Sequence, residues 1–295
     1  MSPTFAALSY GQYRRYLLAQ LSTGIGFWMM RLAQDWLVLD LTDGSGVAVG
    51  IATALQFIPF LIITPFAGVM ADRFSRRTLM IWAHIGLVSI SIVLLVALLT
   101  NTANVAVVFV LAALTGSMAA IDFPSRQALV GQLVGNEHLT NAVALNSVAF
   151  NLARISGPAI AGVLIAGTGL PVVIGVIVAF FAIALTAIAS LRRIPKTRKG
   201  DLPRATFSDG LKFLRSRPEL MFLLALVFFV ALFGLNFQLT TALMATQEFA
   251  GGAASFGILS TFLALGSLVG SLLAARRTQV RVRLIVVSAL AFGSA

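Results

Sequence analysis

Apolar runs of about 20 residues recur along almost the whole chain, and they constrain its fold more than any other feature. A helix needs roughly 20 mainly apolar residues to cross the hydrocarbon core of a bilayer. Eight runs are complete and a ninth begins near residue 284; the eight cover residues 16–39, 47–70, 79–99, 105–121, 145–166, 172–191, 220–244 and 256–275. We therefore predict an all-α integral membrane protein with eight full spans and a partial ninth.

The composition supports a membrane environment. Only 11% of the 295 residues are charged and the mean hydropathy is +0.96, which is too apolar for an ordinary water-exposed surface. A membrane β-barrel would alternate apolar and polar residues along its strands, whereas runs such as IGVIVAFFAIALTAIASL do not alternate. The chain contains no cysteine, so it has neither a disulfide framework nor thiol chemistry.

The basic residues indicate how the chain crosses the membrane. All but two of the 21 Lys and Arg residues lie in segments that the predicted spans place on one side; the exceptions, Arg31 and Arg154, lie inside spans. One of the segments on that side is the loop predicted between the fourth and fifth spans, which carries Arg126. Basic residues near span ends stay in the cytoplasm, so we expect a cytoplasmic N-terminus. The net charge of +11 then reflects topology rather than nucleic-acid binding.

The longest polar segment, residues 192–219, follows the sixth predicted span. Its first part is rich in Pro, Gly and charge, which is typical of a solvated linker. Its second part, 206–217, predicts a short amphipathic helix that lies either on the cytoplasmic membrane surface or beneath the bundle. We predict three parts: a six-span N-terminal bundle at 1–191, a basic cytoplasmic linker at 192–219 and an incomplete C-terminal bundle at 220–295.

A short segment rich in charged residues, GVMADRFSRR at residues 68–77, separates the second and third predicted spans. With six spans and a long basic linker around it, this segment resembles the loop motif of the major facilitator superfamily. The matching residues are Gly68, Ala71, Asp72, Arg73, Arg76 and Arg77, and Ser75 stands where Gly is usual. The resemblance implies a gating loop that latches the two halves of a transporter on the cytoplasmic side and contacts lipid phosphates. The alternative is a topological anchor without gating.

The fifth predicted span carries a Gly-Pro pair. Gly157, Pro158 and Gly162 are similar to part of the motif found there in the superfamily's exporters, although Ala153 and Ala161 stand where Gly is usual. Small residues allow close helix approach, and Pro can bend a helix. The resemblance implies a hinge or seal for alternating access and favours export; ordinary helix packing is the alternative.

Residues 122–162, together with WMMRLAQDWLVLDLT in the first span, are similar to the branch of the superfamily that contains enterobactin exporters and transmembrane secretion effectors. The usual Arg of the fourth span is absent, since Ala112 stands four residues before Gly116, and this argues against a proton relay there. The resemblance implies the superfamily's helical bundle in a bacterial inner membrane. It also implies secondary active export, by proton antiport, of a small organic molecule such as a siderophore-like metabolite or a drug.

Ionisable residues inside spans are functional candidates because each is costly in hydrocarbon. Arg31 and Asp35 lie four residues apart and share a helix face. Either Arg31 contacts an anionic or polar substrate while Asp35 takes up a proton, or the two form a fixed ion pair. Arg154, one turn after Asn151, is expected to line a cavity and to pair with Asp35 or Asp122 or bind substrate. Weaker cavity candidates are the amides Gln56, Asn236 and Gln238.

Other chemistry finds little support. His84 and His138 have no partners at metal-ligand spacing, and no GxxxxGK[ST] loop or Ser-His-Asp set occurs. We expect neither metal, cofactor nor enzyme activity, and an ion gradient as the energy source. A non-transporting membrane receptor or assembly factor on the same fold is the alternative. Complete members of the superfamily have twelve spans, so we expect this chain to be a fragment or a truncated form that does not transport by itself.

Overall fold

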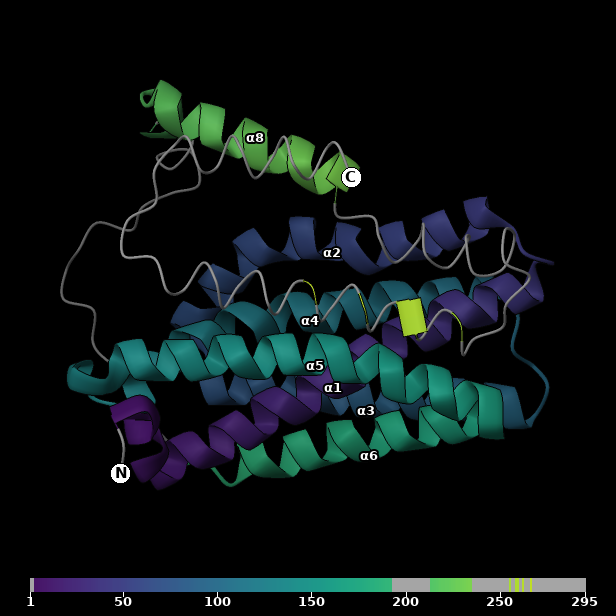
Figure 1. Cartoon of the computed structure of the whole chain (residues 1–295), viewed down its shortest axis with the longest axis horizontal. Helices are drawn as coiled ribbons and strands as arrows, with labels where there is room; N and C mark the ends of the chain where they lie inside the picture. Colours follow the sequence, from purple (N-terminus) through teal and green to yellow (C-terminus); the bar gives the residue numbers. More distant parts are fainter. Residues whose placement is uncertain are drawn as a thin grey trace.

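A computed structural model describes residues 3–192 and 213–234 and the single positions 255, 258, 259, 262 and 266. All the regular elements in this part of the chain are helices (Figure 1). In chain order they are η1 Pro3–Ser9, α1 Gly11–Leu41, α2 Gly46–Arg73, α3 Arg76–Leu99, α4 Val105–Leu133, η2 Asn136–His138, α5 Leu139–Thr168, α6 Leu170–Ala189 and α8 Pro218–Gly234.

Five of these helices are long and apolar enough to cross a membrane. They are Gly46–Thr64 of α2 and the whole of α3, α4, α5 and α6. The 31-residue α1 is long enough to span but carries more polar residues, and it packs inside the same bundle. The described part of the chain is therefore all-α, and several of its helices can span a membrane. α8 covers residues 220–234 of the predicted span 220–244. The rest of that span, most of 256–275 and the partial ninth lie outside the described residues, so the count of eight stays a prediction.

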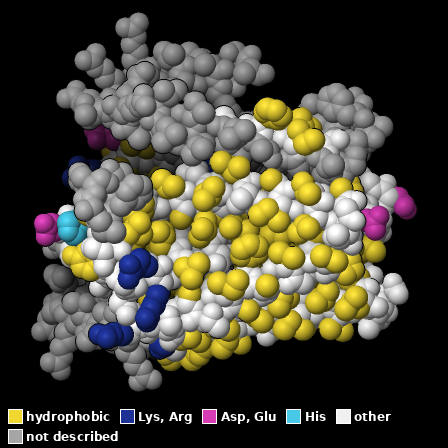
Figure 2. Space-filling model, turned by 60° about the horizontal axis from the view of Figure 1, so that its bottom comes forward, with side chains coloured by type: hydrophobic (Ala, Val, Ile, Leu, Met, Phe, Trp, Pro, Cys, Tyr) yellow, Lys and Arg dark blue, Asp and Glu magenta, His cyan; other side chains and the backbone are white. Residues whose placement is uncertain are grey.

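The helices α1 to α6 run lengthwise in one bundle (Figure 1). α1 packs mainly against α5 and α6, α2 packs against α4, and α3 packs against α4 and α6. One core surrounds Met29 and Phe181, and a second core surrounds Tyr13 and Ile188 nearer the N-terminus. Figure 2 shows an outer face covered by apolar side chains, with Lys and Arg gathered towards one end. This is the surface expected of a bundle whose solvent is lipid.

Residues 68–73 of the charged segment are helical, because α2 continues to Arg73. Only Phe74 and Ser75 connect it to α3. Ser75, which replaces the usual Gly, is the N-cap of α3: its backbone is extended, with φ −68° and ψ 142°, and its side chain accepts a hydrogen bond from the Thr78 N–H at 3.1 Å. A serine is suited to this position because the backbone does not require a positive φ.

α4 also extends beyond its apolar run, from Ile121 to Leu133, and includes Pro124. The prediction that Arg126 lies in a loop between the fourth and fifth spans is therefore wrong. Arg126 lies within α4, and its side chain is only 11% exposed. An ion pair with Asp122, one turn earlier, neutralises both charges and lets this charged stretch remain in the bundle.

The Gly-Pro segment of α5 packs closely on α1, as predicted. A Cβ atom on Gly157 would lie 2.7 Å from the Cβ atom of Trp28, so only glycine allows this approach. Pro158 is buried within an uninterrupted α5, and Gly162 is also buried. Ala153 faces Gly24, so α1 supplies the small residue at that crossing. A hinge role for the segment remains a prediction.

Candidate functional site

Arg31 and Asp35 on α1 are connected through Gln56 of α2. The Gln56 Oε1 atom accepts a hydrogen bond from Arg31 Nε at 3.1 Å, and Gln56 Nε2 lies 3.5 Å from Asp35 Oδ1. Gln56 Nε2 also donates to Gln34 Oε1 at 3.1 Å. Among the salt bridges of the described residues, none joins Arg31 directly to Asp35. In this structure the two charges are therefore connected through an amide, and both alternatives, a substrate and proton site or a fixed structural ion pair, stay predictions.

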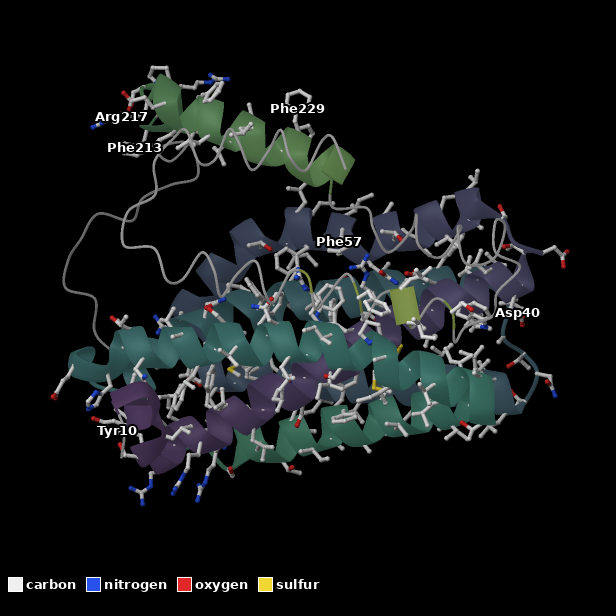
Figure 3. The ribbon with its side chains drawn as sticks, viewed as in Figure 1. Tyr10, Asp40, Phe57, Phe213, Arg217 and Phe229 are labelled. Atoms are coloured by element: carbon white, nitrogen blue, oxygen red, sulfur yellow. The ribbon has the colours of Figure 1, made fainter. Side chains whose placement is uncertain are left out.

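Two aromatic rings flank the guanidinium of Arg31. Its central carbon lies 4.5 Å from the ring centre of Phe57 and 5.5 Å from that of Trp28. Phe57 projects from α2 towards the rest of the bundle (Figure 3). The aromatic faces stabilise the cation and fix its orientation. Arg31 donates a hydrogen bond to Gln56 through Nε, while its guanidinium lies between the two rings.

The amide of Gln34 is a buried polar group beside these side chains. Gln34 is 0% exposed, and its Nε2 atom has no hydrogen-bond partner in the described structure. Leaving a buried donor unpaired costs about 1–3 kcal/mol, so such groups are rare in folded proteins. With the Arg31 guanidinium, the Gln34 amide gives the site donors for an oxygen-rich group.

Gly116 on α4 places Gln56 where it can make these contacts. A Cβ atom at Gly116 would overlap the backbone carbonyl of Gln56, so glycine is required for α2 to cross α4 at this point. The sequence draws attention to Gly116 only through the Arg that is missing four residues earlier. The structure assigns it a packing role beside the candidate site.

The other predicted cavity residues are less closely connected to this site. Asn151 donates to the Ser147 carbonyl of its own helix at 2.9 Å. Asp122, one expected partner of Arg154, pairs with Arg126 instead. Arg154 is half-buried on α5, and its cavity role stays a prediction. Asn236 and Gln238 lie outside the described residues.

Two arginines of the predicted gating loop bind helix carbonyls in this structure. Arg76 donates to the Ala128 carbonyl of α4, and Arg77 donates to the Ala189 carbonyl at the end of α6. Arg15 supports the same end of α6 through the Ser190 carbonyl at 2.9 Å. Basic side chains are favourable near helix C-termini. The other loop residues, Gly68, Asp72 and Arg73, have side chains outside the described part.

A second buried polar cluster joins α1, α3 and α4, and the sequence analysis missed it. Asp122 is 1% exposed and pairs with Arg126, whose Nη1 donates to Gln20 Oε1 at 2.9 Å. His84 is 0% exposed and lies 3.6 Å from Asp122 and 2.7 Å from the Thr23 hydroxyl. The available signal was the spacing of four residues between Asp122 and Arg126, which is also the spacing of Arg31 and Asp35.

The second cluster reaches α5 through two more side chains. The Tyr16 hydroxyl donates to the Arg126 carbonyl at 3.2 Å and accepts a hydrogen bond from Asn146 at 3.0 Å. Four helices therefore share one polar network near the end of the bundle where the N-terminus lies (Figure 1).

Long apolar helices that bury charged and amide side chains between them define a multi-pass membrane protein with polar sites inside its bundle. The family model of the transmembrane secretion effectors matches residues 2–294. The chain therefore belongs to this family of major facilitator superfamily transporters. The resemblance seen in residues 68–77 and 122–162 is confirmed.

Curated relatives in the same superfamily are distant but cover most of this chain. The staphyloferrin A transporter of Staphylococcus aureus is 25% identical over 253 residues, which are 84% of this chain and 63% of that protein. Macrolide efflux protein A of Streptococcus pyogenes is 25% identical over 270 residues, 88% of this chain and 66% of that protein. YfiS of Bacillus subtilis, an uncharacterized MFS-type transporter, is 25% identical over 241 residues, 80% of this chain and 56% of that protein. The chain thus spans less than two thirds of the length of the first of these relatives.

Proposed function

We propose that this chain is part of a secondary active exporter that moves a small organic molecule across a bacterial inner membrane and is driven by a proton gradient. The observation that carries the proposal is the buried Arg31–Gln56–Asp35 connection beside the unpaired amide of Gln34. Family membership and relatives named for a siderophore and for macrolide efflux support it. The substrate class that follows is a siderophore-like metabolite or a drug with oxygen acceptors.

Gln56 provides a physical link between proton and substrate. With Asp35 ionised, the Gln56 amide donates to Asp35 and its carbonyl accepts from Arg31. A protonated Asp35 carries no charge, so the hydrogen bond that its Oδ1 accepts from Gln56 becomes weaker and the attraction between Asp35 and Arg31 is lost. Gln56 and the Arg31 guanidinium are then held less tightly. In this way proton uptake at Asp35 changes the site that holds the substrate, as antiport requires.

The proposal includes the topology and the gate. The N-terminus is cytoplasmic, and the chain divides into a bundle at 1–191, a linker at 192–219 and the start of a second bundle at 220–295. The loop at 68–77 latches the two bundles when the cavity opens outward, and lipid phosphates contact its arginines. In the described state Arg76 and Arg77 hold carbonyls of their own bundle, so the latch requires them to exchange partners.

The experiment uses the protein expressed from its complete gene in everted membrane vesicles. A fluorescent dye reports the pH gradient while siderophores, their precursors and macrolides are added in turn. An exporter driven by protons releases protons from the vesicle interior when its substrate is present, and Asp35→Asn abolishes this release while the protein remains in the membrane. If no compound moves protons or accumulates in wild-type vesicles, or if Asp35→Asn behaves as wild type, proton-driven export through this site is wrong.

A further inference from the structure

Both ring nitrogens of the fully buried His84 face oxygen atoms. Nε2 lies 2.7 Å from the Thr23 hydroxyl oxygen, and Nδ1 lies 2.8 Å from the Met80 carbonyl oxygen. Nδ1 is also 3.6 Å from Asp122 Oδ1, which has no hydrogen-bond donor in the described structure. The proposed export mechanism uses none of these groups.

The Thr23 hydroxyl can serve the ring in either protonation state. Its oxygen is 2.7 Å from the Ala19 carbonyl and 2.7 Å from His84 Nε2. Beside a neutral ring with its proton on Nδ1, the hydroxyl donates to Nε2, and Nδ1–H donates to Met80. Beside a charged ring, Nε2–H donates to the hydroxyl, whose own hydrogen turns to Ala19. Every donor finds an acceptor in both states without movement of a heavy atom.

Asp122 supplies the charge that a protonated ring needs. In this structure its Oδ2 pairs with Arg126, so the carboxylate is already balanced. Arg126 has a second acceptor, Gln20 Oε1, at 2.9 Å. When Arg126 shifts towards Gln20, Asp122 is left to balance a charged His84. Asp122 can therefore change its cationic partner from Arg126 to the protonated His84.

The surrounding helices contribute few other titratable groups. α1 brings Tyr16, whose hydroxyl donates to the Arg126 carbonyl, and α4 brings Asp122 and Arg126 themselves. α5 contributes the amide of Asn146 and carries the cation Arg154, α6 carries no titratable residue, and the described side chains of α2 carry none. Proton exchange at this cluster therefore involves His84 and Asp122, with Arg126 as the competing cation.

We propose that His84 is a proton-binding site whose occupancy is coupled to the Asp122–Arg126 pair. The eight residues from Thr23 to Arg31 place it roughly 12 Å along α1 from the Arg31 site, towards the N-terminal end of the bundle. Its part in transport rests on the proposed function, since a second proton site on that side would carry protons between Asp35 and the cytoplasm. Proton binding itself does not depend on transport.

The test is nuclear magnetic resonance of the ring nitrogens in lipid nanodiscs. The chain has two histidines, so His138→Gln with labelled histidine leaves His84 as a single signal. We expect the neutral ring to carry its proton on Nδ1 at high pH and to convert to imidazolium as the pH falls. A ring that stays neutral at every pH at which the protein remains folded overturns the proposal, and so does a neutral ring with its proton on Nε2.

Variants separate a proton site from a merely buried histidine. At the pH at which half of the wild-type rings are charged, Thr23→Val lowers the charged fraction to about one tenth, because a charged N–H loses its acceptor. Thr23→Ser preserves the wild-type fraction and shows that the Val effect is not misfolding. Asp122→Asn lowers the fraction and Arg126→Gln raises it. Unchanged fractions in Thr23→Val and Asp122→Asn overturn the proposal.

The two proposals can fail separately. A protonating His84 in a protein that exports nothing supports this inference and contradicts the proposed function. If the protein exports by proton exchange but His84 never becomes charged, the proposed function is supported and the proposed proton site at His84 is contradicted.

Discussion

Gln56 is the residue on which the candidate site depends, because it bonds to both Arg31 and Asp35 of α1. Its sequence context marks it only as an amide in an apolar run, and amides in membrane helices often do no more than bridge neighbours. The contacts to Arg31 and Asp35 give it a larger role. The stability of the site should accordingly depend on three side chains rather than two.

The first prediction follows from this three-part arrangement. Arg31→Met and Asp35→Leu should each lower the free energy of unfolding by about 1–3 kcal/mol, because each leaves a buried polar partner unsatisfied. The double variant should recover only part of the loss, since Gln56 then has neither charge to bond. Adding Gln56→Leu together with Gln34→Leu should recover more, because Gln56 also donates to the buried Gln34 amide and both amides must be removed to leave no unpaired polar group. Denaturant unfolding in detergent measures each step, and full recovery in the double variant would contradict the role given to Gln56.

The sequence predicted some of the residues of this site correctly and misplaced others. The spacing of Arg31 and Asp35 correctly indicated one polar face on α1, and Gln56 was among the candidates. The same reading placed Arg126 in a loop, because hydropathy falls where the run at 105–121 ends. A hydropathy profile counts each charge alone, so a helical segment with an internal ion pair has the same low hydropathy as a loop.

Glycine positions decide how closely the helices of this bundle approach. Gly116 and Gly175 lie on different helices, and a Cβ atom would collide with the Gln56 carbonyl at the first but meet nothing within 4 Å at the second. Hydropathy treats the two alike. Their difference comes from the neighbouring helix.

The second prediction compares these two glycines. Gly116→Ala should destabilise the protein by about 1–3 kcal/mol and separate α2 from α4, because the added methyl group overpacks the crossing. Gly175→Ala, the matched control, should stabilise α6 by about 0.5–1 kcal/mol through its better helix propensity. Thermal unfolding in the same detergent provides the comparison. Equal effects at the two positions would mean that α2 and α4 do not cross as described.

The third prediction concerns the crossing of α1 and α5. Gly24→Ala should destabilise the bundle because its Cβ atom would lie 2.7 Å from the Cβ atom of Ala153. The swapped pair Gly24→Ala with Ala153→Gly should recover most of that loss, since it keeps one small residue on each side of the contact. Thermal unfolding of the single and double variants gives the coupling. Additive losses would show that the two residues do not touch.

At the scale of the whole molecule, the two ends of the bundle differ in charge. Asp40 lies at one end and Tyr10 at the other (Figure 3), and Arg14 follows Tyr10 in the first turn of α1. Arginines gather at the second end (Figure 2). This asymmetry underlies the proposed orientation.

The fourth prediction tests that orientation. The native chain contains no cysteine, so a single introduced cysteine has no background. Asp40→Cys should react with a membrane-impermeant maleimide in intact cells, whereas Arg14→Cys should react only after the cells are opened. Both residues are exposed in the structure, so burial does not account for a difference. Labelling of Arg14→Cys in intact cells would reverse the assigned topology.

The class of this protein follows from its amino-acid sequence, because hydropathy and the length of each apolar run can be evaluated one helix at a time. The charged segment at 68–77 also pointed to the superfamily that the family match confirmed. Which polar groups meet depends on the packing of the helices in three dimensions. Gln56 and Arg31 are 25 positions apart, and Thr23 and His84 are 61 apart. Their contacts depend on how each helix is rotated about its axis and on which glycines let helices approach, and in an almost uniformly apolar run the pattern of hydropathy contains little information about that rotation.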